Sequence, residues 1–162
     1  MKRTYEEHRE NEQAFRTFED LEVYKKARQF RRSMYCVTRK LPDFEKYELS
    51  SQIRRASVSL TNNIAEGHGR YHYLEQLKFL FQSRGSLQEL MDDLNVCEDE
   101  RYLPESEVLV LQDQAREVQR LISGYARYLR ARKFGFSSTV RERANEDEFL
   151  NELDLLFNHS TI

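Results

Sequence analysis

The chain has 162 residues, of which 33% are charged and 39% hydrophobic, with only 2 Pro and 5 Gly. This length predicts one domain with a substantial core, and the scarcity of helix-breaking residues favours long helices. No apolar run approaches the length of a membrane span, and the N-terminus has no hydrophobic signal region. We therefore expect a cytoplasmic protein. Its two cysteines, Cys36 and Cys97, fall in expected helices and are predicted to be buried free thiols.

The first predicted helix spans residues 20–41. Asp20 is expected as its N-cap or first-turn acid, and Pro42 follows its end. Apolar residues alternate spacings of four and three, which is typical of the buried seam of a bundle helix. They are Val23, Ala27, Phe30, Met34, Val37 and Leu41.

The second predicted helix spans residues 46–66, with an apolar seam at Leu49, Ile53, Ala56, Leu60 and Ile64. The same helix also contains weak helix formers, which indicate close backbone approach or side-chain hydrogen bonds across an interface. These are Ser57, Ser59, Thr61, Asn62 and Asn63. Gly67 and Gly69 follow, and we expect a positive φ there to end the helix abruptly.

A third helix is expected over residues 73–100 and a fourth from about Pro104 to Lys133. The third has its seam at Leu77, Leu80, Arg84, Leu87, Met91 and Leu94, with Arg84 reaching outward from it. Gly85 and Ser86 in mid-helix would let another helix approach closely. The fourth has its seam at Val108, Leu111, Ala115, Val118, Ile122, Tyr125 and Leu129. Four such helices with short connections predict an all-α, antiparallel up-down-up-down four-helix bundle over residues 18–133.

The two ends of the chain differ from this body. Residues 1–17 are polar and are expected to be an N-terminal extension. Residues 134–162 contain two basic and six acidic residues, and they are expected to be an acidic C-terminal extension. A short amphipathic patch in it is either a fifth helix that packs on the bundle or a partner-binding segment, and we favour packing. The patch consists of Phe149, Leu150, Leu153, Leu156 and Phe157.

Several motifs carry a resemblance to a known family. The central one is Ser59-x-x-x-Asn63-Ile64-Ala65-Glu66-Gly67 followed by Gly69-Arg70, with flanking motifs from Phe18 to Tyr24, from Glu48 to Ala56 and from Gly85 to Leu90. Together they resemble a bacterial family of small four-helix-bundle proteins encoded within intervening sequences of 23S rRNA genes. The resemblance implies a homopentamer with a poorly defined activity. It also implies a distant relation to the accessory variability protein of diversity-generating retroelements, a basic pentamer that works with a reverse transcriptase and nucleic acid.

The residues give little support for catalysis. His68 and His72 are four apart, but the glycines between them indicate a helix end, so a metal site is disfavoured. Glu66 near Asn62, Asn63 and Arg70 is more typical of a buried structural network than of a general acid or base. We therefore expect a protein that is not an enzyme, with no catalytic, cofactor-binding or metal-binding residues.

Basic residues give the strongest functional indication. Residues 20–133 contain 20 basic and 17 acidic residues, and no acid lies between Val23 and Leu41. An uncompensated basic face over several helical turns favours contact with phosphates or with a neighbouring subunit. The candidates for nucleic-acid binding are Lys25, Lys26, Arg28, Arg31, Arg32, Arg39, Lys40, Arg54 and Arg55.

Two hypotheses follow. The first is a noncatalytic, self-assembling scaffold or adaptor, with a pentamer implied by the resemblance. Its interface candidates are Ser59, Asn62, Asn63, Glu66, Gly67, Arg70, Gly85 and Ser86. The second is an accessory factor that binds RNA or DNA, with a reverse transcriptase as a partner implied by the resemblance.

Overall fold

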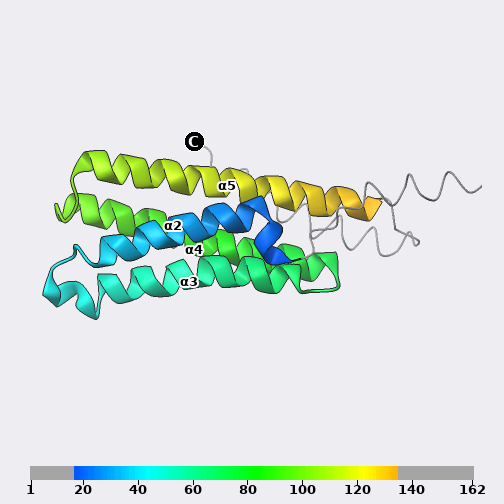
Figure 1. Ribbon diagram of the computed structural model, residues 1–162, viewed down its shortest axis with the longest axis horizontal. Coiled ribbons are helices and arrows are strands. Elements are labelled where there is room, and N and C mark those ends of the chain that lie inside the picture. The colour runs from blue at the N-terminus through cyan, green and yellow to red at the C-terminus, as the bar shows by residue number, and fades with distance from the viewer. Residues whose placement is uncertain (1–16, 135–162) are drawn as a thin grey trace, which may run out of the picture. The chain divides into compact units, whose positions relative to one another are not determined.

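The computed structural model describes residues 17–134, which form four long α-helices and two short 3-10 turns (Figure 1). In chain order these are η1 (Phe18–Asp20), α2 (Glu22–Thr38), η2 (Asp43–Lys46), α3 (Leu49–His68), α4 (Tyr73–Asp99) and α5 (Glu105–Phe134). Residues 17–134 contain no strand, so the all-α prediction with four helices is confirmed. The expectations for the first 16 residues and for the tail from residue 135 onward lie outside the described residues.

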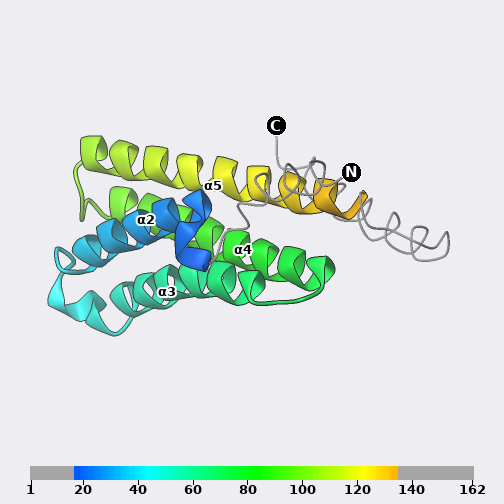
Figure 2. The same ribbon diagram turned by 45° about the vertical axis from the view of Figure 1, so that its right-hand side comes forward.

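The packing of the four helices is described for residues 17–129, because the chain divides into two units after Leu129. Helix α3 lies against both α2 and α4 (Figure 2). Helix α5 is joined by ion pairs to Lys26 of α2, through Glu117, and to Lys40 just after the end of α2, through Glu107. Because Gln112 of α5 also hydrogen bonds to Asn95 of α4, the four helices neighbour one another in the order α2, α3, α4, α5 and back to α2, which closes a four-helix bundle.

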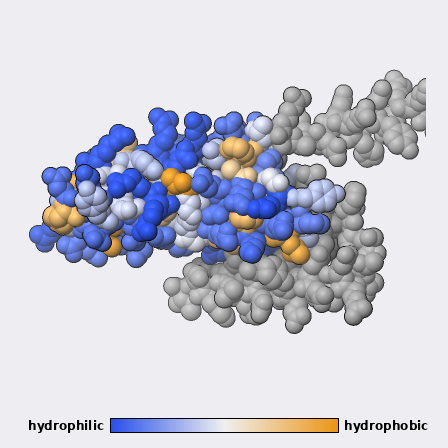
Figure 3. All heavy atoms as spheres, turned by 90° about the horizontal axis from the view of Figure 1, so that it is seen from below, coloured by the Kyte–Doolittle hydropathy of each residue, from blue (hydrophilic) through white to orange (hydrophobic). Residues whose placement is uncertain are grey.

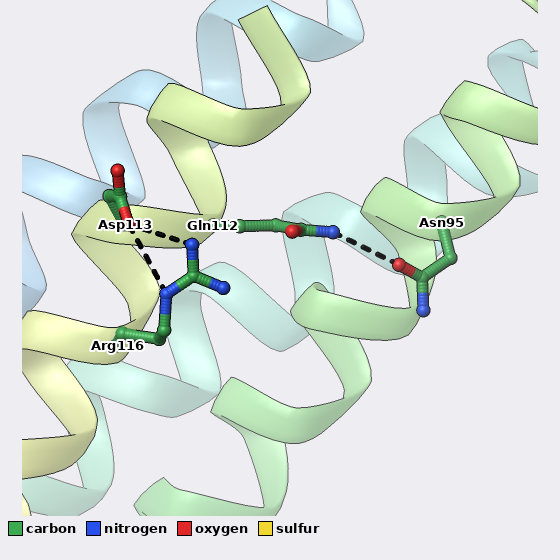
Figure 4. Close-up of polar contacts among 4 residues, drawn as sticks. All are labelled: Asn95, Gln112, Asp113 and Arg116. Carbon is green, nitrogen blue, oxygen red and sulfur yellow. Dashed lines mark hydrogen bonds and ion pairs between the residues drawn. The ribbon is translucent and has the colours of Figure 1, made fainter. Parts of the chain in front are cut away.

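Helices α4 and α5 are joined at their surface by an amide pair (Figure 4). The Nε2 atom of Gln112 donates a hydrogen bond of 3.1 Å to Oδ1 of Asn95. One turn further along α5, the guanidinium of Arg116 pairs with the carboxylate of Asp113 at 2.7 Å. This second pair lies within α5, so it does not contribute to the contact between α4 and α5.

The core is built from the seams that the sequence predicts for α2, α3 and α5. Every predicted seam residue of α2 and α3 is buried. In α5 all are buried except Tyr125, which is half-buried, while Ala126 is buried in addition. Burying a Leu, Ile, Val, Phe or Met side chain stabilises the fold by roughly 1.5–3 kcal/mol. These stripes are therefore the main source of stability.

The predicted seam of α4 is partly wrong. Met91 is only half-buried. Arg84 is also half-buried, which agrees with the expectation that it reaches outward, and burial lowers its pKa. Ser83 and Asp93, which the seam did not include, are buried. Spacings of four and three average about 3.5 residues, whereas a straight α-helix has about 3.6 residues per turn. Over the 27 residues of this helix, the positions that face the core therefore shift away from the predicted seam. Some of those positions are small or polar.

The helix ends also differ from expectation. Asp20 accepts a hydrogen bond of 3.1 Å from the Thr17 amide and so closes η1, while α2 begins at Glu22. Helix α3 continues through Gly67 to His68, and Gly69 has a φ of −75°, so the expected positive φ is absent at both glycines. Arg101 has the positive φ instead, at 58°, directly after α4. There the Tyr102 amide donates to the Cys97 carbonyl at 2.8 Å, which satisfies the end of the helix.

The two thiols lie in different environments. Cys97 is buried, as expected, and burial raises the pKa of its thiol to about 12. Cys36 is exposed on α2, so the prediction that it is buried is wrong. Within residues 17–134, no helix combines the length and apolar character that a membrane crossing requires.

Candidate nucleic-acid interface

The basic residues of the α2 segment lie on two different sides of the helix. Its three lysines each pair with a glutamate: Lys25 with Glu22 at 2.6 Å, Lys26 with Glu117 at 2.9 Å and Lys40 with Glu107 at 2.5 Å. Two of these partners belong to α5, so those lysines tie α2 to α5. Exposed pairs of this kind contribute little stability, about 0–1 kcal/mol, but they neutralise the lysine charge. The lysines are therefore weaker candidates for phosphate binding than the sequence indicates.

The arginines of α2 lie on its other edge, beside α3. There the two helices enclose an open groove with two parts that share Tyr35 and Val58. We call this the arginine groove. One part is lined by Arg31, Arg32, Tyr35, Cys36, Arg39 and Val58. The other is lined by Tyr35, Arg54, Arg55, Val58, Ser59, Asn62 and Asn63.

The arginine groove contains no acidic residue among the residues that line it. Within the part of the chain that the structure describes, Arg32, Arg39 and Arg55 have no carboxylate within ion-pairing distance. Arg31 Nη1 donates to Thr61 Oγ1 at 2.7 Å, and Arg54 Nη2 donates to the Lys46 carbonyl at 3.0 Å. These neutral acceptors orient the guanidinium groups without cancelling their charge. Five positive charges therefore face one open groove, and such an arrangement attracts anions.

Arg28 lies outside the arginine groove. It lines a neighbouring hollow on α2 together with Glu19, Tyr24, Lys25, Gln29 and Arg32. Glu19 brings a negative charge to that hollow, so its field is weaker than that of the groove. The structure thus brings together five of the nine predicted basic residues and separates Arg28 and the three lysines from them.

Most of the predicted interface motif is used inside the chain, where it joins α3 to α4. The Ser86 hydroxyl donates to Ser59 Oγ at 2.8 Å, and Asn63 Nδ2 donates to the Ser59 carbonyl at 2.9 Å and to its Oγ at 3.1 Å. The Ser83 hydroxyl donates to the Leu60 carbonyl at 2.6 Å. Asn62 is the exception, because it is exposed and lines the arginine groove.

The two glycines of the motif differ in their surroundings. A Cβ atom on Gly67 would lie 3.0 Å from Phe79 Cβ and 3.2 Å from the Gln76 carbonyl oxygen, so α3 and α4 approach each other closely there. A Cβ atom on Gly85 would meet nothing within 4 Å. The prediction of a close approach at Gly85 is therefore wrong within this chain, whereas Ser86 beside it does contact α3.

Glu66 and Arg70 form an ion pair at the end of α3 with both side chains about half exposed. The expected buried polar cluster around Glu66 is therefore wrong. Arg70 also lies 4.7 Å from the centre of the Phe79 ring, and its carbonyl accepts a hydrogen bond of 2.7 Å from Gln76 Nε2. These contacts with α4 fix the turn between the two helices.

Asp93 is a charged residue of α4 that lies in the core, with 2% of its surface exposed. Its Oδ1 accepts a hydrogen bond of 2.8 Å from Gln52 Nε2 on α3, while its Oδ2 has no hydrogen-bond partner among the described residues. Burial, followed by repulsion from Glu89, raises the pKa of Asp93 to about 6. The signal that could have revealed it is its spacing, because Asp93 lies three residues after Leu90 and four before Cys97.

His68 ends α3 and His72 precedes α4, so the two histidines flank a turn as expected. Among residues 17–134, no group of three or more His, Cys, Asp or Glu side chains could hold a metal ion.

The fold and the groove define a class of protein: a four-helix bundle with an arginine-lined groove between two of its helices. The family model described as 23S rRNA-intervening sequence protein matches residues 19–124, which is more than half of the chain. The chain therefore belongs to the 23S rRNA-intervening sequence protein family. A comparison with curated proteins finds no significant match.

Proposed function

We propose that this protein is a noncatalytic adaptor that binds the phosphates of RNA or DNA in the arginine groove. The observation that supports this function best is the convergence of five arginines from two helices on one open groove without an acid. Guanidinium groups bind phosphate oxygens through paired hydrogen bonds, and their charge displaces the counterions of a nucleic acid. Figure 3 views the molecule from the α3 side, and outside the grey atoms that face is mainly hydrophilic with only small apolar spots.

The test is a matched pair of charge reversals. Arg32→Glu with Arg55→Glu changes the groove, whereas Arg116→Glu with Arg120→Glu makes the same change in net charge on α5. We expect the groove variant to bind a 20-nucleotide single-stranded RNA or DNA about 10- to 100-fold more weakly at low salt. Its affinity should also depend less on salt, because each lost phosphate contact reduces the slope of log K against log salt by about 0.7 for a single strand.

The α5 variant should bind like the unchanged protein. Equal losses in both variants would mean that only net charge matters and that the arginine groove is not the site. If the unchanged protein binds neither RNA nor DNA at low salt, the proposed function is wrong.

A second candidate function, self-assembly, is favoured by exposed apolar side chains on α4 and α5. Val96 is 37% exposed on α4, and Leu109 and Val110 are 51% and 57% exposed on α5. We propose that Leu109 and Val110 contact a second subunit in a homopentamer, as the resemblance implies, with each subunit an up-down-up-down bundle. The short connections between neighbouring helices support that topology.

Assembly is tested by light scattering at micromolar concentration. We expect an oligomer for the unchanged protein and a smaller species for Leu109→Asp with Val110→Asp. A monomeric unchanged protein would contradict self-assembly. The exposed thiol of Cys36 then reports on the groove: rapid alkylation in the oligomer means that assembly leaves the groove open. The resemblance further supports a reverse transcriptase as the enzyme that such an adaptor accompanies in the cytoplasm.

A further inference from the structure

The shape of the arginine groove points to one class of nucleic acid. It lies between two neighbouring helices of one bundle, and the axes of packed helices are about 8–10 Å apart, so the groove is narrow. Proteins read duplex DNA by inserting a convex element, such as a helix, into a groove of the DNA that is about 12 Å wide. Here the protein supplies the concave surface. A duplex therefore reaches only the rims of the groove, whereas an extended single strand can lie inside it.

The groove is lined by charged side chains from both helices and by apolar ones. Three arginines come from α2 and its C-cap and two from α3. Tyr35 and Val58 line both parts of the groove and supply apolar surface between these charges. A positively charged groove with an aromatic side chain is the arrangement on which single-stranded nucleic acids bind, because the phosphates contact the charges and a base stacks on the ring.

Asn62 adds a group that can read a base. It is exposed, it lines the groove beside Tyr35, and none of the hydrogen bonds found within residues 17–134 involves its side-chain amide. Its neighbour Asn63 uses its own amide nitrogen on Ser59 and is therefore less free. A side-chain amide pairs with the edge of an unpaired base through one donor and one acceptor.

From these features we infer that the arginine groove is a site for a single strand, with phosphates on the arginines, a base stacked on Tyr35 and a base edge at Asn62. This inference rests on the proposed function and narrows it. A duplex satisfies only the first of the three contacts. The groove should therefore prefer single strands to a duplex. This preference should come from Tyr35 and Asn62, which contact bases, rather than from the arginines, which contact phosphates.

The experiment compares a 20-nucleotide oligothymidine, an oligouridine of the same length and an unstructured mixed-sequence strand with the duplex of that mixed sequence. Binding is measured by fluorescence anisotropy on the full chain. We expect the single strands to bind at least tenfold more tightly than the duplex. Equal affinities would overturn the inference while leaving the proposed function intact. Absence of binding to every probe would overturn both.

Variants at Tyr35 separate stacking from charge. Tyr35→Phe keeps the ring and should bind normally. Tyr35→Leu keeps the apolar bulk of a half-buried side chain but removes the ring, and it should lose about tenfold affinity for single strands with an unchanged salt slope. It should not change affinity for the duplex. If Tyr35→Leu binds single strands like the unchanged protein, the stacking role is wrong.

Asn62→Ala tests base reading. We expect it to weaken binding of the mixed-sequence strand more than binding of the duplex, and to do so without changing the salt slope. A loss that is equal for both probes would assign Asn62 to backbone contact and contradict its role as a reader of bases.

Cys36 supplies a footprint that does not depend on any substitution. It lines the groove as an exposed thiol, whereas Cys97 is buried and serves as the unreactive internal reference. Oligothymidine should slow alkylation of Cys36 by N-ethylmaleimide, and the duplex at the same occupancy should slow it less. Alkylation that is unaffected by a saturating single strand would place the strand outside the groove and overturn the inference.

Discussion

The two sides of α3 differ in how they are filled. Toward α4 the helix is closed by side-chain hydrogen bonds, such as Ser83 to the Leu60 carbonyl, and by direct contact at Gly67. Toward α2 it leaves an open groove whose arginines have no acidic partner among the described residues. One motif of weak helix formers serves both sides, because Ser59 and Asn63 bond within the chain while Asn62 remains exposed in the groove. We therefore expect stability to depend mainly on the α4 side of α3, and the proposed ligand binding to depend on the α2 side.

The largest effect that would test this comparison is expected at Gly67. Replacement by Ala places a Cβ atom 3.0 Å from Phe79 Cβ and 3.2 Å from the Gln76 carbonyl, so α3 and α4 must move apart. We expect the free energy of unfolding to fall by about 1–3 kcal/mol, as is typical of overpacking. Denaturant unfolding followed by circular dichroism measures this change.

Gly85→Ala is the matched control, because it makes the same substitution in a neighbouring helix. Its Cβ atom meets nothing within 4 Å, so it should raise stability by about 0.5–1 kcal/mol through helix propensity. If both substitutions stabilise the protein, the close approach at Gly67 is not a determinant of stability.

Asp93 is a buried ionisable residue at the contact between α3 and α4. Its pKa of about 6 is above the value of an exposed aspartate, so the carboxylate costs free energy in the folded state once it is ionised. Its contribution is most favourable at low pH, below the pKa of the unfolded chain, and is lost as pH rises through about 6. Asp93→Asn removes this titration while keeping an oxygen for Gln52. Between pH 5 and 7.5 the stability of this variant relative to the unchanged protein should therefore increase by roughly 1 kcal/mol.

That prediction is measured as a difference between two pH profiles, so titrations common to both proteins cancel. A relative stability that stays constant between pH 5 and 7.5 would contradict the raised pKa. The substitution should leave oligothymidine binding unchanged, since Asp93 faces α3 from α4 and does not line the groove.

Ser83 should have an effect of similar size or smaller. Its hydroxyl is fully buried and donates to the Leu60 carbonyl across the α3–α4 contact. Ser83→Ala removes that bond and should cost about 1 kcal/mol. Ser33→Ala is its control, because the Ser33 hydroxyl reaches only the Gln29 carbonyl of its own helix at 3.4 Å. Thermal unfolding should separate the two variants, and an equal effect would mean that the hydrogen bond between helices adds nothing.

How far the sequence predicts this molecule depends on the kind of residue. Apolar spacing predicts the helices and three of the four seams, because burial of large side chains dominates the free energy of folding. The seam of α4 was mispredicted where Ser83 and Asp93 face inward, since small and polar residues carry a weak periodic signal. Close approach of a neighbouring helix was expected at Gly85 but is found at Gly67, because the local sequence does not reveal where the neighbouring helix lies.

The candidate site was predicted in part for a similar reason. Helical spacing identifies the basic run but not which partner each residue meets. Lys26 and Lys40 face α5, whose glutamates lie more than sixty residues further along the chain. Tyr35 and Val58 were not predicted as groove residues at all, because no local pattern reveals that two helices leave space between them.

The smallest effect on stability is expected in the groove itself, at Asn62. The residue is exposed within α3, and Asn is a poorer helix former than Ala. Asn62→Ala should therefore raise the free energy of unfolding slightly, by a few tenths of a kcal/mol, because no contact within the bundle is lost. Chemical denaturation measures the change, with Asn63→Ala as the comparison at the next position of the motif.

Asn63→Ala should instead be destabilising, since it removes two hydrogen bonds to Ser59. If Asn62→Ala proves the more destabilising of the two, the groove is part of the stability framework, and the separation of the two sides of α3 is wrong. A binding residue that costs stability is expected where a ligand selects it, because its interactions are satisfied only in the complex.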